Sequence, residues 1–141
     1  MSPHHHDHDH GDVPDKGLTR NQKLVFDALE RADGPLSAYS ILDALRGEGL
    51  RAPPQVYRAL EKLLETGLVH RLESLNAFVA CAHPHACAHA LTAFAICEKC
   101  GTVAEFADEV VEARLDAWAG GTGFVPRRTT VEIKGLCAAC A

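Results

Sequence analysis

Two pairs of cysteines with the same spacing carry the clearest chemical signal in this 141-residue sequence. Cys97 and Cys100 lie in "FAICEKCG", Cys137 and Cys140 lie in "GLCAACA", and 36 residues separate the two pairs. Four thiolates about 2.3 Å from Zn²⁺ make a closed tetrahedral site, and each CxxC turn supplies two of them at a fixed separation. The spacing therefore favours a structural zinc site that stabilises a small domain.

Two other uses of these thiols compete with the zinc interpretation. A redox-active CxxC is expected at a helix N-terminus in a thioredoxin-like fold, whereas each pair here follows a strand-like run. Structural disulfides are rare in the reducing cytoplasm. The N-terminal "MSPHHHDHDHGD" lacks the apolar segment of a signal peptide, and no apolar run is long enough to span a membrane. We therefore expect a cytoplasmic protein and rank thiol redox chemistry and disulfides below zinc.

A second set of potential metal ligands lies around the middle of the chain. It mixes imidazole, thiol and carboxylate groups and consists of His70, Cys81, His83, His85, Cys87, His89 and Glu105. Each of them alone has an ordinary explanation as a surface or core residue, but together they form a dense donor set. A set that contains a thiolate suits zinc better than ferrous iron. With no general base or nucleophile pair in the sequence pattern, we expect no enzymatic activity.

Three short helices and a β-hairpin are predicted to position the first of these ligands. Thr19 and Gln22 form a capping-box pattern before the first helix, and Ser37 is a suitable cap for the second. Pro53 and Pro54 suit the first turn of the third helix. "LVHRL" and "AFVAC" are β-prone runs joined by the turn-like "ESLN". This order is the outline of a winged helix-turn-helix, whose third helix enters the major groove of DNA.

The outer face of the predicted third helix is polar and cationic. Gln55, Arg58 and Lys62 lie opposite its leucine-rich face, with Tyr57 at the border. The whole chain has a net charge of −5, but residues 18–80 carry eight acidic and eight basic side chains. A neutral domain can bind DNA if its basic side chains share one face. From this stripe alone, a DNA-reading surface and an ordinary solvated surface are equally good interpretations.

The second half of the chain reads as strand, cysteine turn, strand, helix and strand. This small α/β unit has edge strands and few core residues, so we expect it to complete its core by forming a homodimer. The predicted fold class is α+β. The predicted segments are a disordered His/Asp-rich tail (1–17), a winged-helix DNA-binding domain (18–82), a connector (83–92) and a dimerisation domain with the structural zinc site (93–141).

Several motifs together resemble the ferric-uptake-regulator family, and most closely its zinc-uptake-regulator branch. The most specific are "VYRAL", "LVHRLESLNAFVAC" and the doubled CxxC, and the resemblance covers residues 18–140. It implies a homodimeric, metal-dependent transcriptional repressor that binds double-stranded operator DNA. It also implies two Zn²⁺ ions per subunit, one structural and one regulatory.

The resemblance assigns the metal ligands residue by residue. The structural zinc site of the family corresponds to Cys97, Cys100, Cys137 and Cys140. The regulatory site corresponds to His70, Cys81, Glu105 and a histidine before the "F-x-I-C" strand. His89 fits that histidine best, and His85 is the next candidate, because the connector differs from the family in length and composition.

The resemblance also assigns DNA contacts. They are Tyr39 in "SAY" and Arg58 in "VYR", with Tyr57 close by. Gln55 and Lys62 are added only because they lie on the same outer face of the third helix.

The functional hypothesis is a zinc-responsive repressor of zinc-uptake and zinc-homeostasis genes. A metal joining the wing to the dimerisation domain would set the distance between the two recognition helices of a dimer. Only one distance matches half-sites about 34–36 Å apart, so zinc would act as a co-repressor by favouring the DNA-competent state. The alternatives are an iron- or peroxide-responsive regulator of the same family, a zinc-buffering protein that does not bind DNA, and a thiol oxidoreductase.

Overall fold

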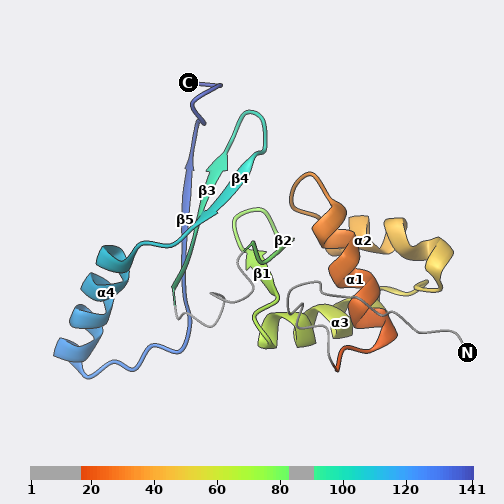
Figure 1. Ribbon diagram of the computed structural model, residues 1–141, viewed down its shortest axis with the longest axis horizontal. Coiled ribbons are helices and arrows are strands. Elements are labelled where there is room, and N and C mark those ends of the chain that lie inside the picture. Colours follow the sequence, from red (N-terminus) through yellow and green to blue (C-terminus); the bar gives the residue numbers. More distant parts are fainter. Residues whose placement is uncertain (1–16, 83–90) are drawn as a thin grey trace, which may run out of the picture.

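The computed structural model describes residues 17–82 and 91–141, which form two units in contact with each other (Figure 1). Three helices and a two-stranded hairpin come first, and a three-stranded sheet with one helix follows. This is the predicted α+β architecture of a winged helix followed by a small α/β unit. The predicted tail, apart from Gly17, lies outside the described residues.

The helices of the first unit begin where the sequence places capping side chains. They are α1 (Arg20–Arg31), α2 (Ala38–Leu45), a short 3-10 helix η1 (Arg46–Glu48) and α3 (Pro53–Glu65). The Thr19 hydroxyl accepts a hydrogen bond from the Gln22 N–H at 3.2 Å, and the Gln22 side chain accepts one from the Thr19 N–H at 3.0 Å. The Ser37 hydroxyl accepts one from the Ser40 N–H at 3.1 Å. These bonds satisfy N–H groups that have no partner within the helix, and they confirm the predicted caps.

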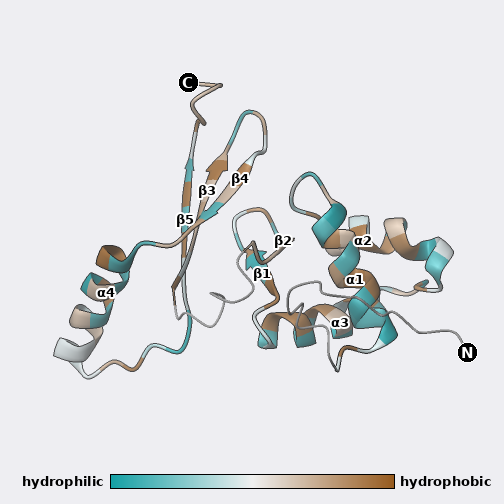
Figure 2. Ribbon diagram, in the orientation of Figure 1, coloured by the Kyte–Doolittle hydropathy of each residue, from teal (hydrophilic) through white to brown (hydrophobic). Residues whose placement is uncertain are grey.

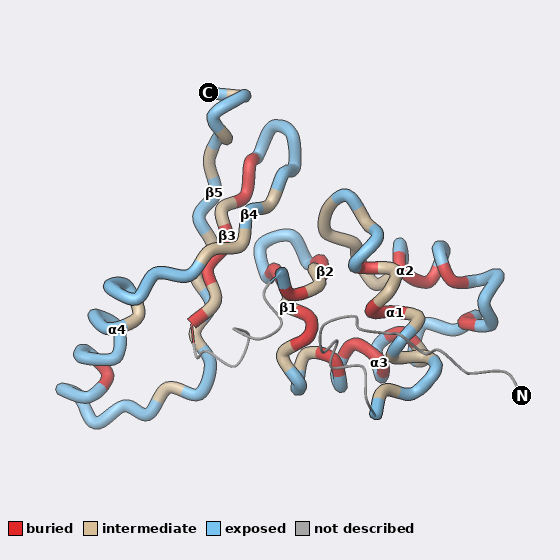
Figure 3. The backbone as a smooth tube through the Cα atoms, in the orientation of Figure 1, coloured by how far each residue is buried: buried red, intermediate tan, exposed pale blue. Residues whose placement is uncertain are grey.

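One hydrophobic core holds the three helices together. Val25 of α1, Ile41 of α2 and Leu60 of α3 are fully buried and belong to a single cluster. Figure 2 shows apolar residues on the facing sides of these helices, and Figure 3 shows that the same segments are buried. The winged-helix unit therefore has a core of its own, and its outer helix faces remain available for a ligand.

The hairpin that follows α3 is the wing. Its strands β1 (Val69–Leu72) and β2 (Ala77–Ala80) pair antiparallel around the turn at residues 73–76. The Leu36 N–H donates to the Phe78 carbonyl at 3.0 Å, and the Phe78 N–H donates to the Leu36 carbonyl at 2.8 Å. These bonds attach the wing to the loop between α1 and α2, and therefore to the helical unit.

The second unit is a sheet with the strand order β4–β3–β5. Its elements are β3 (Leu91–Cys97), β4 (Val103–Phe106), α4 (Glu109–Thr122) and β5 (Thr129–Gly135). The strands β3 and β5 are parallel, and α4 lies in the crossover that such a pair requires. The sheet begins inside the predicted connector, because Leu91 and Thr92 already pair with Thr129 and Thr130.

Apolar side chains of α4 face solvent. Val110 is 72 % exposed and Trp118 is 63 % exposed, whereas Ala119 is buried. Ile133 and Leu136 at the end of β5 are also more than half exposed. Figure 3 shows α4 as mostly exposed and standing away from the helical unit. A patch of this kind marks an interaction surface.

A small second core lies between the wing and the sheet. Leu72 of β1 and Phe94 of β3 are fully buried in it, and Val79 of β2 and Val103 of β4 pack against it. The two units are therefore in apolar contact as well as close in space. None of the helices in residues 17–82 and 91–141 is long and apolar enough to cross a membrane.

Candidate metal centres

The four paired cysteines converge at one end of the sheet. Because β3 and β5 are parallel neighbours with Cys97 opposite Gly135, the turns that follow both strands lie side by side. The Glu98 N–H donates to the Gly135 carbonyl at 2.8 Å and holds the two turns together. The four ligand sulfurs all lie within 4.8 Å of one another. The parallel register thus brings the two CxxC turns into one cluster.

The spacing of the sulfurs fits a tetrahedral metal site. Cys100 Sγ and Cys137 Sγ are 3.7 Å apart. Ligands about 2.3 Å from a tetrahedral zinc ion lie about 3.8 Å from each other, whereas disulfide-bonded sulfurs lie about 2.05 Å apart. All four cysteines are free thiols. The cluster is therefore arranged to share a cation rather than to form disulfides.

The thiols of this cluster have unequal acidity. Hydrogen bonds from the backbone, first that of Cys100 and then that of Cys137, lower the pKa of Cys97 to about 6. The Thr102 hydroxyl, 3.0 Å from Cys100 Sγ, lowers the pKa of Cys100. The neighbouring Cys137 thiol raises the pKa of Cys140 to about 12. Crowded thiolates repel one another, and a bound cation would offset this repulsion.

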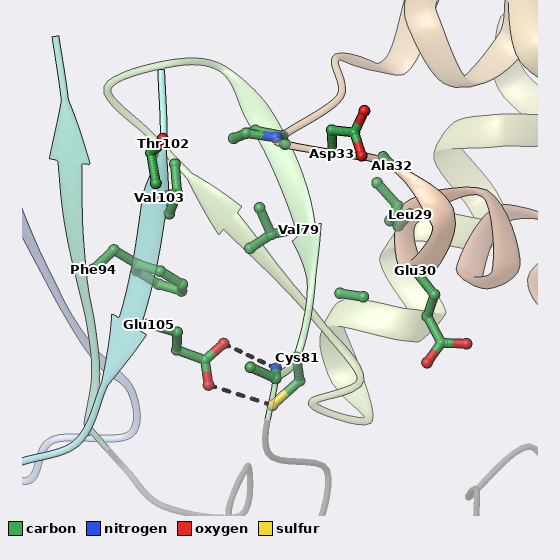
Figure 4. Close-up of a pocket in the computed structure, with 14 residues that line it drawn as sticks. Leu29, Glu30, Ala32, Asp33, Val79, Cys81, Phe94, Thr102, Val103 and Glu105 are labelled. Atoms are coloured by element: carbon green, nitrogen blue, oxygen red, sulfur yellow. Dashed lines mark hydrogen bonds between the residues drawn. The ribbon is translucent and has the colours of Figure 1, made fainter. Parts of the chain in front are cut away.

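A second cluster joins the wing to the sheet. It consists of His70 on β1, Cys81 directly after β2 and Glu105 on β4, whose ligand atoms all lie within 4.8 Å of one another. His70 Nε2 is 3.8 Å from Glu105 Oε1, and Cys81 Sγ is 3.7 Å from Glu105 Oε2. Glu105 Oε1 also accepts a hydrogen bond from the Ala82 N–H at 3.2 Å. Figure 4 shows the carboxylate pointing from the sheet toward Cys81.

The second cluster is shielded but can be reached from solvent. The side chains of His70 and Glu105 are only 13 % and 11 % exposed. Cys81 and Glu105 also line an open pocket of about 500 Å³ between the end of α1, β2 and β4 (Figure 4). The pocket provides a route by which an ion could reach the buried donors.

His70 is held in the form that binds metals. Burial lowers its pKa below the ordinary value of 6.5; the Glu105 carboxylate raises it, and Arg128 lowers it further. The net result is a lowered pKa. The His70 imidazole is therefore neutral at neutral pH and offers a lone pair to a metal, as ligation requires.

We expect the free energy of unfolding of the zinc-free protein to fall as the pH is lowered from about 7.5 to about 5.5. Because the folded pKa of His70 lies below 6.5, the unfolded chain takes up this proton at a higher pH than the folded chain does. The contribution of the neutral His70 to the free energy of unfolding is therefore complete above pH 6.5. It is lost as the pH falls from 6.5 to the folded pKa. Urea unfolding at several pH values should show a shallower pH dependence for His70→Gln than for the wild type. Equal slopes in the two proteins would contradict the lowered pKa.

The donor set of the second cluster fits zinc. It offers one imidazole nitrogen, one sulfur and one carboxylate oxygen, all of which occur in protein zinc sites. Cys81 is disulfide-bonded in the structure, so its sulfur can bind zinc only after reduction to the thiolate. The predicted fourth ligand His89 lies outside the described residues, as do His83, His85 and Cys87. Three of the four predicted regulatory ligands therefore come together in the structure.

Two residues that contact the candidate metal ligands were not among the predicted site residues. Phe94 lies beside Glu105 in the sheet, and its ring meets the His70 ring edge-on at a centroid distance of 5.6 Å. Thr102 contacts Cys100, as described above. The Phe94 contact depends on strand register, whereas Thr102 lies two residues after Cys100, and this proximity to a CxxC pair could have suggested a role.

The predicted DNA-contact residues lie on the helical unit. Tyr39 on α2 is 71 % exposed, Tyr57 on α3 is 48 % exposed, and Arg58 is exposed beside it. Within residues 17–82 and 91–141 these side chains remain exposed, as a surface that contacts a partner requires.

The two residues chosen only by helical face have intramolecular contacts. The amide oxygen of Gln55 accepts hydrogen bonds from the N–H groups of Arg51 at 3.0 Å and Ala52 at 3.1 Å. Gln55 therefore closes the N-terminus of α3, a role that its third position in the helix could have suggested. Lys62 lies 3.9 Å from the Glu65 carboxylate.

Comparison with known proteins gives consistent results. The family model of the ferric uptake regulator family matches residues 17–134. The zinc uptake regulation protein of Escherichia coli K12 is 43 % identical over 124 residues, which cover 87 % of this chain and 72 % of that protein. The protein of the same name from Mycobacterium tuberculosis H37Rv is 32 % identical over 123 residues, covering 86 % of this chain and 92 % of that protein.

Solved structures show the same arrangement of both units. A zinc uptake regulator complexed with zinc and DNA is 41 % identical and has a TM-score of 0.81, with 86 % of this chain and 81 % of that chain covered. The crystal structure of holo XcZur is 43 % identical and has a TM-score of 0.79, with coverages of 86 % and 84 %.

Proposed function

Because the chain belongs to the ferric uptake regulator family, we propose that it is a zinc-responsive, DNA-binding transcriptional repressor of zinc-uptake and zinc-homeostasis genes. One observation carries the proposal: His70 and Cys81 of the wing meet Glu105 of the sheet in one largely shielded cluster. The chain is similar to a regulator solved with zinc and DNA, and this similarity supports zinc and DNA as the ligands of this chain. Membership of a family of regulators supports a role without enzymatic activity. Binding of operator DNA would be consistent with a cytoplasmic protein.

Each subunit is proposed to hold two zinc ions. Cys97, Cys100, Cys137 and Cys140 would hold the structural ion, which agrees with their mutual proximity and free thiols. His70, Cys81 and Glu105 would hold the regulatory ion, with His89 as the proposed fourth ligand. When bound, zinc supplies positive charge that offsets the carboxylate and thiolate and ties their strands together.

The wing transmits the position of the regulatory ligands to the recognition helix. Only residues 66–68 separate α3 from β1. The Cys81 N–H also donates to the Leu68 carbonyl at 2.8 Å. Fixing His70 and Cys81 against the sheet therefore fixes the direction of α3 relative to the second unit. Ligands that bind one orientation better than the others shift the protein toward it.

The operator-binding form is proposed to be a homodimer. The exposed apolar side chains of α4 and the end of β5 supply a surface that a second copy would cover. Two copies present two α3 helices, and half-sites on one face of DNA lie about 34–36 Å apart. The orientation of α3 against the sheet sets the spacing of the helices, so the regulatory site controls the fit to the operator.

An electrophoretic mobility shift with a candidate operator tests the function. Protein that lacks regulatory metal should give a discrete shift when Zn²⁺ is added, and a scrambled duplex should not shift. Restoration by Fe²⁺ but not by Zn²⁺ would favour an iron-responsive regulator. Zinc binding without any sequence-dependent shift would favour a zinc-buffering protein.

Replacing Arg58 with alanine should weaken operator binding. If Arg58 reads a guanine, the loss is expected to be about 1–3 kcal/mol, or roughly 5- to 150-fold in Kd. Fluorescence anisotropy with operator and scrambled duplexes measures the loss of specific binding. Arg31→Ala, at the far end of α1, is the control and should bind like the wild type. An Arg58→Ala protein with unchanged operator affinity would remove Arg58 from the interface.

A further inference from the structure

Three side chains lie in a row across the face of the sheet that meets the wing. In the strand register, Phe94 of β3 is opposite Glu105 of β4 on one side and opposite Glu132 of β5 on the other. Residues directly opposite each other in neighbouring strands point to the same face. Glu105 faces the base of the wing, and Glu132 is therefore placed to meet another part of it.

Glu132 binds the turn at the tip of the wing. Its carboxylate accepts hydrogen bonds from the N–H groups of Glu73 at 3.0 Å and Ser74 at 3.2 Å, and from the Ser74 hydroxyl. Both donors belong to the turn between β1 and β2. Hydrogen bonds to an ionised carboxylate are stronger than those between neutral groups, so this contact favours one position of the wing against the sheet.

The contact of Glu132 complements that of the regulatory ligands. His70 and Cys81 face Glu105 near the base of the wing, Leu72 and Phe94 are buried between, and Glu132 holds the tip. Arg128 adds a bond from its guanidinium to the Leu64 carbonyl of α3 at 3.2 Å. None of these hydrogen bonds needs a metal, and Glu132 is not one of the clustered donors.

We propose that Glu132 is a positioning residue for the regulatory metal site. The proposal rests on the proposed function in one respect, that His70, Cys81 and Glu105 bind zinc. Their apparent affinity equals the intrinsic affinity multiplied by the fraction of molecules in which the ligands converge. By holding the wing tip on the sheet, Glu132 raises that fraction before the metal arrives.

Glu132→Gln tests the proposal, because it removes the charge and keeps the shape of the side chain. The zinc affinity of the regulatory site, measured by competition with a chromophoric chelator, should fall about 5- to 100-fold. At saturating Co²⁺ the absorption spectrum of the site should match that of the wild type, because the ligands are unchanged. Operator binding should likewise need more zinc but reach the wild-type level at saturation.

Glu73→Gln is the matched control. It removes a carboxylate from the same turn, one that lies 3.7 Å from Arg71, and keeps the backbone N–H that Glu132 binds. Its zinc affinity should stay within about twofold of the wild type, since exposed ion pairs contribute little. Equal losses in both variants would overturn the assignment to Glu132, as would wild-type affinity in Glu132→Gln.

Ser74→Ala provides a second route if Glu132→Gln does not fold, as judged by circular dichroism and retained structural zinc. It removes one of the three hydrogen bonds and should weaken zinc binding in the same direction, by a smaller factor. The double variant should lose less than the sum of the single losses, because the two side chains act through one contact. The proposal would be overturned if Ser74→Ala had wild-type zinc affinity and the double variant showed additive losses. It would also be overturned if Ser74→Ala had wild-type zinc affinity and Glu132→Gln did not fold.

A wild-type protein that binds no zinc at His70, Cys81 and Glu105 would instead refute the proposed function.

Discussion

Replacing Cys137 with serine is expected to unfold the C-terminal unit and to abolish the dimer. The second unit has few buried residues, and its strands β3 and β5 end in the two cysteine turns. A structural zinc site contributes about 10–16 kcal/mol of binding free energy, whereas whole domains are stable by only about 5–15 kcal/mol. Loss of one of four thiolates should therefore remove most of the stability of this unit.

Zinc content, circular dichroism and size-exclusion chromatography check this expectation. Cys137→Ser should lose its structural zinc ion, lose part of its β-sheet signal and elute as a monomer or an aggregate. Ala139→Ser is the matched control, because it places a hydroxyl in the same turn and removes no ligand. A Cys137→Ser protein that remains a zinc-containing dimer would show that the cluster is not a structural zinc site.

Replacing Cys81 with serine should abolish zinc-dependent operator binding and leave a folded dimer. Cys81 is buried and its sulfur lies 3.7 Å from Glu105 Oε2. Serine does not ionise and gives a much weaker zinc ligand. Changes in residues that only support zinc ligands already cost about 10- to 100-fold in affinity. We therefore expect a loss beyond about 100-fold for this ligand, at zinc concentrations that saturate the wild type.

Operator titrations at fixed free zinc separate this result from unfolding. Cys81→Ser should keep the structural zinc ion and the elution volume of the wild type. Ala82→Ser, one residue further along the chain, is the control and should keep the zinc response. A full zinc response in Cys81→Ser would remove Cys81 from the regulatory site.

Local features of the fold were predictable from the sequence. The capping residues Thr19 and Ser37, the prolines at the start of α3 and the two CxxC pairs act over a few residues. The structure confirms the predicted helix starts. They could be predicted because the effects of these residues do not depend on distant parts of the chain. The structure also brings together His70, Cys81 and Glu105, three of the residues that the family resemblance assigns to a regulatory site.

Contacts between distant segments were not predictable in this way. Phe94 and Glu132 read as ordinary strand residues until the register of β3 with β4 and β5 places Phe94 beside Glu105 and Glu132 beside Phe94 on the same face. A shift of one residue would turn these side chains to the other face of the sheet.

The sequence by itself determined which groups can bind metal and which segments are helices and strands, because spacing and capping are local properties. The tertiary structure decided which of those groups meet. The parallel pairing of β3 and β5 places the two CxxC turns at one end of the sheet, and the docking of the wing places His70 and Cys81 against Glu105. Both depend on packing between residues tens of positions apart, where burial of Leu72 and Phe94 and the hydrogen bonds of Glu132 select one arrangement.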